Sequence, residues 1–338
     1  MKNIIRTPIM GNLYRSPINL TNLLALLTAV MTLSAHALSF NFSYDASLTN
    51  IMGAAGAYSV QQGFAAAGQY FQNTYTDPMT VNISVYWGNA GGFSGSGFAS
   101  SISTGYSNTF ANIRSALNTD RKTAADYTSF SSGTVAGADP FGGLTNLTRA
   151  NAKAIGLVAA NDGAVDGKIN FGSNSWSVLN YDVNNRAVPG KYDFVGVVEH
   201  ELSEAMGRIE WLDVPANGNY LLDLFRYTAA NTRNTSIGAG VSGVKFSYDN
   251  GTNLFTEFNA KPGGDPNDWS TNNVIDAYNA YVDLPDSAGS RMPVTQTDNL
   301  TLDVIGYDMI PEPTVISLFG VGSVWLIVRA RKRKHLSD

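Results

Sequence analysis

The residues best suited to chemistry in this chain lie between positions 199 and 210. Four of the six glutamates fall there, around His200, one of only three histidines. In the run His200-Glu201-Leu202-Ser203-Glu204, positions i and i+4 share one helix face, so His200 and Glu204 can reach a single metal ion. Glu201 would then stand beside the ion as a base. The spacing predicts a hydrolytic metal site, with a carboxylate where zinc usually has a second histidine.

A helix beginning near Asp193 must hold these groups. Apolar residues recur at helical spacing on one side and predict a core-facing stripe: Val195, Val198, Leu202, Ala205 and Ile209. Asp193 is placed to cap the start, and Gly207 weakens the end. A simpler interpretation makes the charged side a solvated helix face, in which Arg208 pairs with Glu204 at i,i+4.

Patterns on either side of this helix predict an α+β fold. Residues 51–75 and 109–117 have helical patterns, and 79–87 alternate as a half-buried strand. Residues 126–146 predict weak local order, 154–160 a buried strand, and 168–171 a hairpin partner for 175–178. Thr295 and Asp298 form a capping-box pattern that opens a last helix through Ile305. Strands therefore precede the key helix, and mixed structure follows it.

Both ends of the chain have the composition of targeting signals. An apolar stretch from Leu20 to Leu33 follows three basic residues and precedes Ala35-His36-Ala37, which predicts a signal peptide over residues 1–37. Residues 311–338 begin with Pro311-Glu312-Pro313, continue as an apolar run over 314–328, and end in a basic cluster. That order predicts a short membrane span with a cytoplasmic tail.

The remaining residues, 38–310, are enough for one large domain and are clearly acidic. They carry 14 Lys and Arg against 25 Asp and Glu, a net charge of −11. Such a surface argues against nucleic acid as a partner, because phosphate binding needs basic patches. The chain contains no cysteine, which excludes disulfides and thiol chemistry.

Several of these motifs resemble the metzincin branch of the zincin metallopeptidases. His200, Glu201, Glu204, Gly207 and Glu210 match the positions of the pattern His-Glu-x-x-His-x-x-Gly-x-x-His/Asp, with glutamate at two ligand places. The segment 166–171 followed by Trp176 is similar to their substrate-binding edge strand. Met292-Pro293 resembles their Met-turn. The resemblance implies a zincin-like domain over 38–310, with an active-site helix packed on a mixed sheet.

More narrowly, the chain resembles a bacterial family of PEP-CTERM-anchored metalloproteases. Four segments in order carry this likeness: 200–208, 222–227, 263–265 and 302–308. The C-terminus resembles the PEP-CTERM sorting signal of Gram-negative bacteria. It implies an exosortase-type enzyme acting at Pro311-Glu312-Pro313, brief residence in the inner membrane through 314–328, and delivery to the cell envelope, surface or extracellular matrix.

In this interpretation His200 and Glu204 bind a zinc or manganese ion, and Glu201 is the general base that takes a proton from metal-activated water. The third ligand is Asp223, which lies in a family-like segment, or Glu210, which has metzincin spacing. Calcium is a weaker candidate ion. Its ligands would be four aspartates in predicted loops, which are Asp162, Asp166, Asp265 and Asp268. A substrate peptide would pair with an edge strand formed by Lys168, Ile169, Asn170 and Phe171.

The sequence thus predicts an exported metal-dependent endopeptidase that hydrolyses peptide bonds in a polypeptide substrate. One alternative is a non-catalytic surface or extracellular-matrix protein that keeps the zincin-like fold and contacts glycans or proteins. Another is a processing enzyme that acts on itself or on one neighbouring protein.

Overall fold

The computed structural model describes residues 38–93, 98–135, 137–173, 175–209, 219–235, 241–270, 274–281 and 289–310. The predicted signal peptide and sorting signal lie outside these residues. No helix in the described part is both long and apolar enough to cross a membrane.

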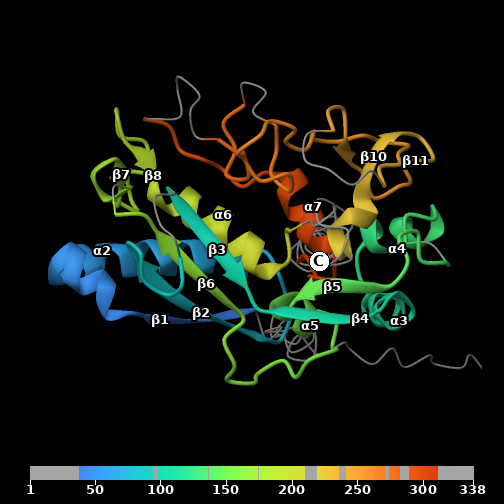
Figure 1. The fold of residues 1–338 in the computed structure, drawn as a ribbon, viewed down its shortest axis with the longest axis horizontal. Helices are drawn as coiled ribbons and strands as arrows, with labels where there is room; N and C mark the ends of the chain where they lie inside the picture. The colour runs from blue at the N-terminus through green and yellow to red at the C-terminus, as the bar shows by residue number, and fades with distance from the viewer. Residues whose placement is uncertain are drawn as a thin grey trace, which may run out of the picture. The chain divides into compact units, whose positions relative to one another are not determined.

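A four-stranded mixed sheet carries the N-terminal half of the domain (Figure 1). Its order is β1 (Ser39–Tyr44), β2 (Thr80–Trp87), β6 (Gly167–Phe171) and β3 (Ala99–Ser103). The first three strands are parallel, and β3 runs antiparallel to β6 at the edge. The alternating pattern of β2 is confirmed, because Val81, Ile83 and Val85 are buried.

The position of β6 corrects one sequence prediction. Lys168, Ile169, Asn170 and Phe171 pair with β2 on one side and with β3 on the other, so they form an interior strand. Residues 175–177 are a short 3₁₀ helix rather than a hairpin partner. The edge strand on this side of the sheet is β3, whose serine-rich sequence has little of the apolar pattern by which strands are recognised.

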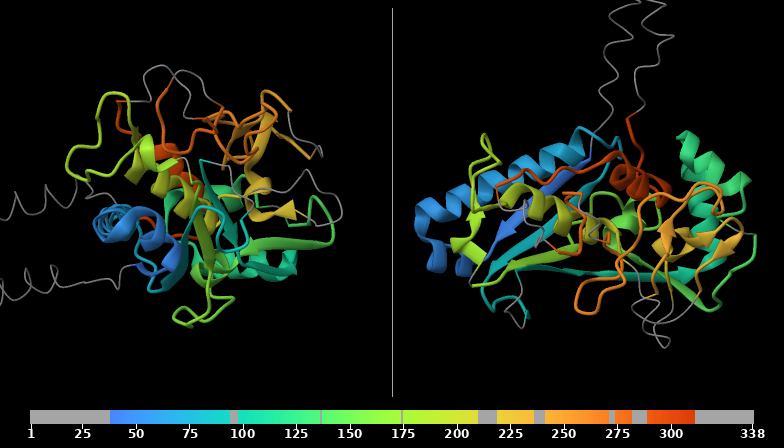
Figure 2. Two further views of the ribbon diagram at one scale, coloured as in Figure 1. Left: turned by 60° about the vertical axis from the view of Figure 1, so that its left-hand side comes forward. Right: turned by 90° about the horizontal axis from the view of Figure 1, so that it is seen from above.

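Two helices, α2 (Ala46–Gln72) and α6 (Phe194–Met206), pack on the same face of this sheet and against each other (Figures 1 and 2). α2 covers β1 and β2, while α6 covers β6 and β3. They meet at Gly63, where the ring of Phe194 occupies the space a Cβ atom would need. Phe194 also packs on Phe171 and Phe64, so aromatic residues fix the height of α6 above the sheet.

The start of α6 is as predicted, although Asp193 does not cap it. Asp193 occupies the N-cap position, yet its carboxylate makes no capping hydrogen bond to the helix. The helix ends at Gly207, whose φ of 130° suits glycine. A Cβ atom on Gly207 would also crowd Asn151 and Ile305.

Further helices and small sheets make up the rest of the described chain. The further helices of the first half are α3 (Phe110–Asp120), α4 (Ala124–Ser131) and α5 (Arg149–Ala154). A second sheet has the order β4 (Gly105–Thr109), β5 (Leu144–Thr148) and β9 (Asn219–Tyr220), and a two-stranded pair joins β7 (Leu179–Asn180) to β8 (Tyr192–Asp193). A third sheet has the order β11 (Thr232–Arg233), β10 (Arg226–Ala229) and β12 (Lys245–Phe246), and α7 (Gln296–Val304) follows near the end.

Of two local predictions before α6, one holds in part and one is wrong, while one after α6 is confirmed. Residues 126–146 begin with the end of α4, which the capping box of Thr123 and Asp126 opens, and end with the start of β5; weak local order is confirmed only for the described residues between them. Residues 155–160 turn back onto α5 instead of forming a strand, after Gly156 at φ 74° ends the helix. The capping box of Thr295 and Asp298 opens α7 as expected.

The contact at Gly63 gives a test of what positions α6. Gly63→Ala should lower the free energy of unfolding by about 1–2 kcal/mol, because overpacking against Phe194 outweighs the gain in helix propensity. Urea denaturation measures this change. Gly105→Ala is the matched control, since a Cβ atom there meets nothing within 4 Å. Equal stability of the two variants would show that α2 and α6 separate easily at Gly63.

Candidate metal centre

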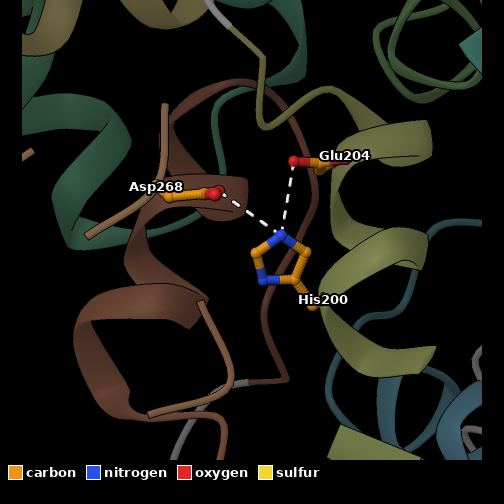
Figure 3. A group of neighbouring side chains, drawn as sticks. All are labelled: His200, Glu204 and Asp268. Carbon is orange, nitrogen blue, oxygen red and sulfur yellow. Dashed lines mark ion pairs between the residues drawn. The ribbon is translucent and has the colours of Figure 1, made fainter. Parts of the chain in front are cut away.

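Three side chains from two distant parts of the described chain converge on one point. His200 and Glu204 come from α6, and Asp268 comes from a loop 64 residues beyond Glu204 (Figure 3). One ligand atom from each lies within 4.8 Å of the other two. The Nε2 atom of His200 lies 3.4 Å from Oε1 of Glu204 and 3.5 Å from Oδ1 of Asp268.

These separations fit a bound ion. Two ligand atoms about 2.05 Å from a tetrahedral zinc ion lie about 3.3 Å apart. The two distances from Nε2 are close to that value and too long for strong hydrogen bonds. One imidazole and two carboxylates suit zinc and also harder ions such as manganese.

A contact at Nδ1, the ring nitrogen that faces away from Glu204 and Asp268, sets the orientation of the His200 ring. Nδ1 lies 2.8 Å from the carbonyl oxygen of Ala277, the geometry of an N–H donating to that oxygen. This contact leaves the lone pair of the neutral ring on Nε2, which faces Glu204 and Asp268. Histidine ligands of metals are commonly held in this way.

Glu204 is held at both carboxylate oxygens. The hydroxyl of Ser101, on edge strand β3, donates to Oε2 at 2.8 Å, and the side-chain amide of Asn267 donates to Oε1 at 3.1 Å. Asn267 also donates to Oδ1 of Asp268 at 3.1 Å. The helix, the edge strand and the loop of Asp268 therefore share one hydrogen-bond network.

Backbone bonds close the loop that delivers Asp268. The amide of Asn259 donates to the carbonyl of Asp268 at 2.7 Å, and the next residue, Trp269, donates to Tyr278 at 2.8 Å. Buried Trp269 packs on Phe258 at the base of the loop. The sequence pattern indicated Asp268 only as a candidate calcium ligand. It did not predict Asp268 beside His200, because no helical or strand spacing links the two residues.

The charges of the cluster depend strongly on one another. Burial opposes the charged form of His200, but Asp268 and Glu204 outweigh it and raise the pKa of His200 to about 10. Burial would raise the pKa of Glu204, yet His200, Arg208 and Ser101 lower it to about 2. Burial raises the pKa of Asp268 to about 6, against the pull of His200 and Arg208. A divalent ion would further favour ionised carboxylates and a neutral imidazole.

Glu201 differs from its neighbours in having a free oxygen. Its side chain is 5% exposed, and Oε2 has no hydrogen-bond partner among the described residues. Burial, together with the charge of Glu204, raises the pKa of Glu201 well above its usual value. The solvated-face interpretation is thus wrong, because Glu199, Glu201 and Glu204 are all buried.

These groups line a cavity of about 350 Å³. One wall is the edge strand with the residue before it, from Phe98 to Ser101, and another is the loop from Gly263 to Asp265. Residues 279–281 and Met292 close the remaining sides. The cavity thus presents the metal-ligand cluster, the free carboxylate of Glu201 and a strand edge to one incoming molecule.

Met292 lies on the cavity wall and is tied to the start of α6. Its amide donates to Asp193 Oδ2 at 3.0 Å, and its carbonyl accepts from Arg186 at 3.1 Å. Arg186 also pairs with Asp193 and Glu199. Burial raises the pKa of Glu199 to about 7 although Arg186 opposes the shift. This network fixes Met292 near the start of α6, on the wall of the cavity that His200 also lines.

Of the other predicted ligands that the structure describes, Asp265 lines the same cavity outside the three-residue cluster, and the rest lie away from it. Asp223 is fully buried in a 3₁₀ helix, where its Oδ2 accepts from the amide of Tyr220 at 2.8 Å, and it is not part of the three-residue cluster. Glu210 lies outside the described residues. Asp162 and Asp166 are paired with Arg149 and Lys153, so their charges are met by the protein itself.

No model of a known protein family matches this chain, and neither a curated protein sequence nor a solved structure matches it significantly.

The geometry predicts which aspartate completes the centre. Asp268→Asn should reduce zinc affinity by about 10-fold to 100-fold or more, because a charged ligand oxygen is lost. Asp223→Asn should bind zinc normally, since an asparagine oxygen can still accept from the amide of Tyr220. Metal content after dialysis distinguishes the two. Loss of zinc in Asp223→Asn alone would restore the earlier assignment.

Proposed function

We propose that this protein is an exported, zincin-like metallopeptidase whose active site is the cavity around His200. The observation that carries the proposal is the position of His200 Nε2, at metal-ligand spacing from Glu204 and Asp268 and beside the free carboxylate of Glu201. The mixed sheet supports a zincin-like fold, because its antiparallel edge strand lies along the helix that carries the ligands.

His200, Glu204 and Asp268 would hold a divalent ion, zinc or manganese. When bound, such an ion supplies Lewis acidity to water and to the scissile carbonyl group. Glu201 would accept the proton of the attacking water and pass it to the leaving amine. Its free oxygen and its place one residue after the first ligand suit that role.

A peptide substrate would bind along β3. This strand has a partner only on the β6 side among the described residues, so its other edge can pair with an extended peptide. Ser101 sits on β3 and donates to Glu204, which places the strand directly beside the proposed ligands. Export and exosortase sorting rest on the terminal sequences alone and complete the proposal.

Glu201→Gln tests the catalytic part of this proposal. The variant should retain one metal ion per chain and lose about 10²-fold to 10⁴-fold in peptide hydrolysis, because only the base is removed. His200→Ala should lose both metal and hydrolysis. The measurements are metal content by mass spectrometry and cleavage of a diverse quenched-peptide library by the purified 38–310 domain.

Glu257→Gln is the matched control, because Glu257 lines a different cavity and should leave both properties unchanged. Hydrolysis that persists equally in His200→Ala and Glu201→Gln would overturn the assignment. Stoichiometric metal with no cleavage of any peptide by the unmodified domain would instead favour the non-catalytic surface protein.

A further inference from the structure

Arg208 is a buried cation that the proposed reaction does not use. Its side chain is fully buried, although it follows directly after the end of α6. Gly207 turns the chain with its φ of 130°, and the side chain of Arg208 returns over the last turn of the helix. Burying a guanidinium is costly unless several partners compensate it.

Those partners come from three directions. Nε donates to the hydroxyl of Ser203 at 2.8 Å, and Nη1 donates to the carbonyl of Asn267 at 3.2 Å. The guanidinium carbon lies 4.3 Å from the centre of the Tyr278 ring, a cation–π contact. Arg208 is therefore fixed by groups that are not metal ligands.

Its charge is directed at the candidate ligands. Nη1 donates to Oδ1 of Asp268 at 2.5 Å, and Nη2 lies 3.6 Å from Oε1 of Glu204 without a hydrogen bond. These are the same two oxygens that face Nε2 of His200. Arginine stays protonated in proteins and does not ligate metals, so Arg208 brings a permanent positive charge next to the ligand atoms.

Two buried carboxylates close together repel each other strongly and need a counter-charge. Among the described residues, only His200 and Arg208 form ion pairs with Glu204 or Asp268. Histidine must be neutral to bind a metal, so the lasting charge compensation comes from Arg208.

We propose that Arg208 is the built-in counter-cation of this metal centre: it holds Glu204 and Asp268 together when no ion is bound. The domain then folds with its ligands in place, and the ion enters a prebuilt site. Arg208 is a positioning residue in this scheme, and it also repels the ion. This inference rests on the proposed metal site.

A thermodynamic cycle between Arg208 and zinc tests the idea. Arg208→Met should melt well below the unmodified domain after chelator treatment, because Glu204 and Asp268 lose their partner. Zinc should restore most of that loss, and the zinc Kd should fall by about 10-fold or more, since the ion no longer opposes a nearby charge. The readouts are Tm with and without zinc, and Kd from competition with a chelating dye.

Arg149→Met is the matched control. Arg149 pairs with Asp162 and Asp166, and it contacts none of the proposed ligands. Its loss should lower Tm, while the zinc-induced rise in Tm stays that of the unmodified domain. If Arg208→Met only lost stability in general, its zinc-induced rise in Tm would match that of Arg149→Met. A zinc-induced rise in Arg208→Met that does not exceed that of the unmodified domain would therefore overturn the proposal.

Arg208→Gln covers the case in which Arg208→Met does not fold even with zinc. Glutamine removes the charge but keeps a hydrogen-bond donor for Ser203 or Asp268, so its zinc-induced rise in Tm should still exceed that of the unmodified domain. No excess would overturn the proposal. If zinc binds neither to the unmodified domain nor to His200→Ala, the metal centre itself is refuted. This outcome separates failure of the metal site from failure of the Arg208 proposal.

Discussion

The central constraint on this molecule is charge balance inside a buried cluster. Glu204 and Asp268 can lie together only because His200 and Arg208 face the same two oxygens. Ser101 and Asn267 donate hydrogen bonds to further lone pairs of Glu204. Strand β3, helix α6 and the loop that carries Asp268 are therefore all bound to the cluster. These bonds hold the surrounding elements in positions that bring the partners together at one point.

The architecture places that cluster between two differently built halves. On one side, α6 is held above the mixed sheet by aromatic packing around Phe194. On the other side, long loops with little regular structure supply Asp268, Ala277 and Met292. The regular half gives His200 and Glu204 a rigid base. The irregular half shapes the cavity wall and therefore has most of the influence on what can enter.

Arg208 also changes the electrostatic character of the proposed centre. One imidazole and two carboxylates would leave a bound divalent ion formally neutral and so a weak Lewis acid. The guanidinium beside both carboxylates adds a single positive charge to that sum. Glu204, the extra carboxylate that sets this motif apart from a two-histidine zinc helix, is thus compensated by Arg208, four residues later in the same segment.

The sequence by itself determined the features that depend on near neighbours. It predicted the mixed α+β class, the helix that presents His200, Glu201 and Glu204, strand β2 with its buried face, and the capping box of α7. These follow from spacings of two to four residues, which fix the side-chain direction on a strand or a helix. Only the tertiary structure decided that Asp268 rather than Asp223 lies beside His200 and Glu204, that β3 rather than β6 forms this edge of the sheet, and that Arg208 is buried against the cluster. Those choices depend on loops that close over tens of residues and on the cost of leaving a buried charge unpaired, and no local pattern in the sequence records either.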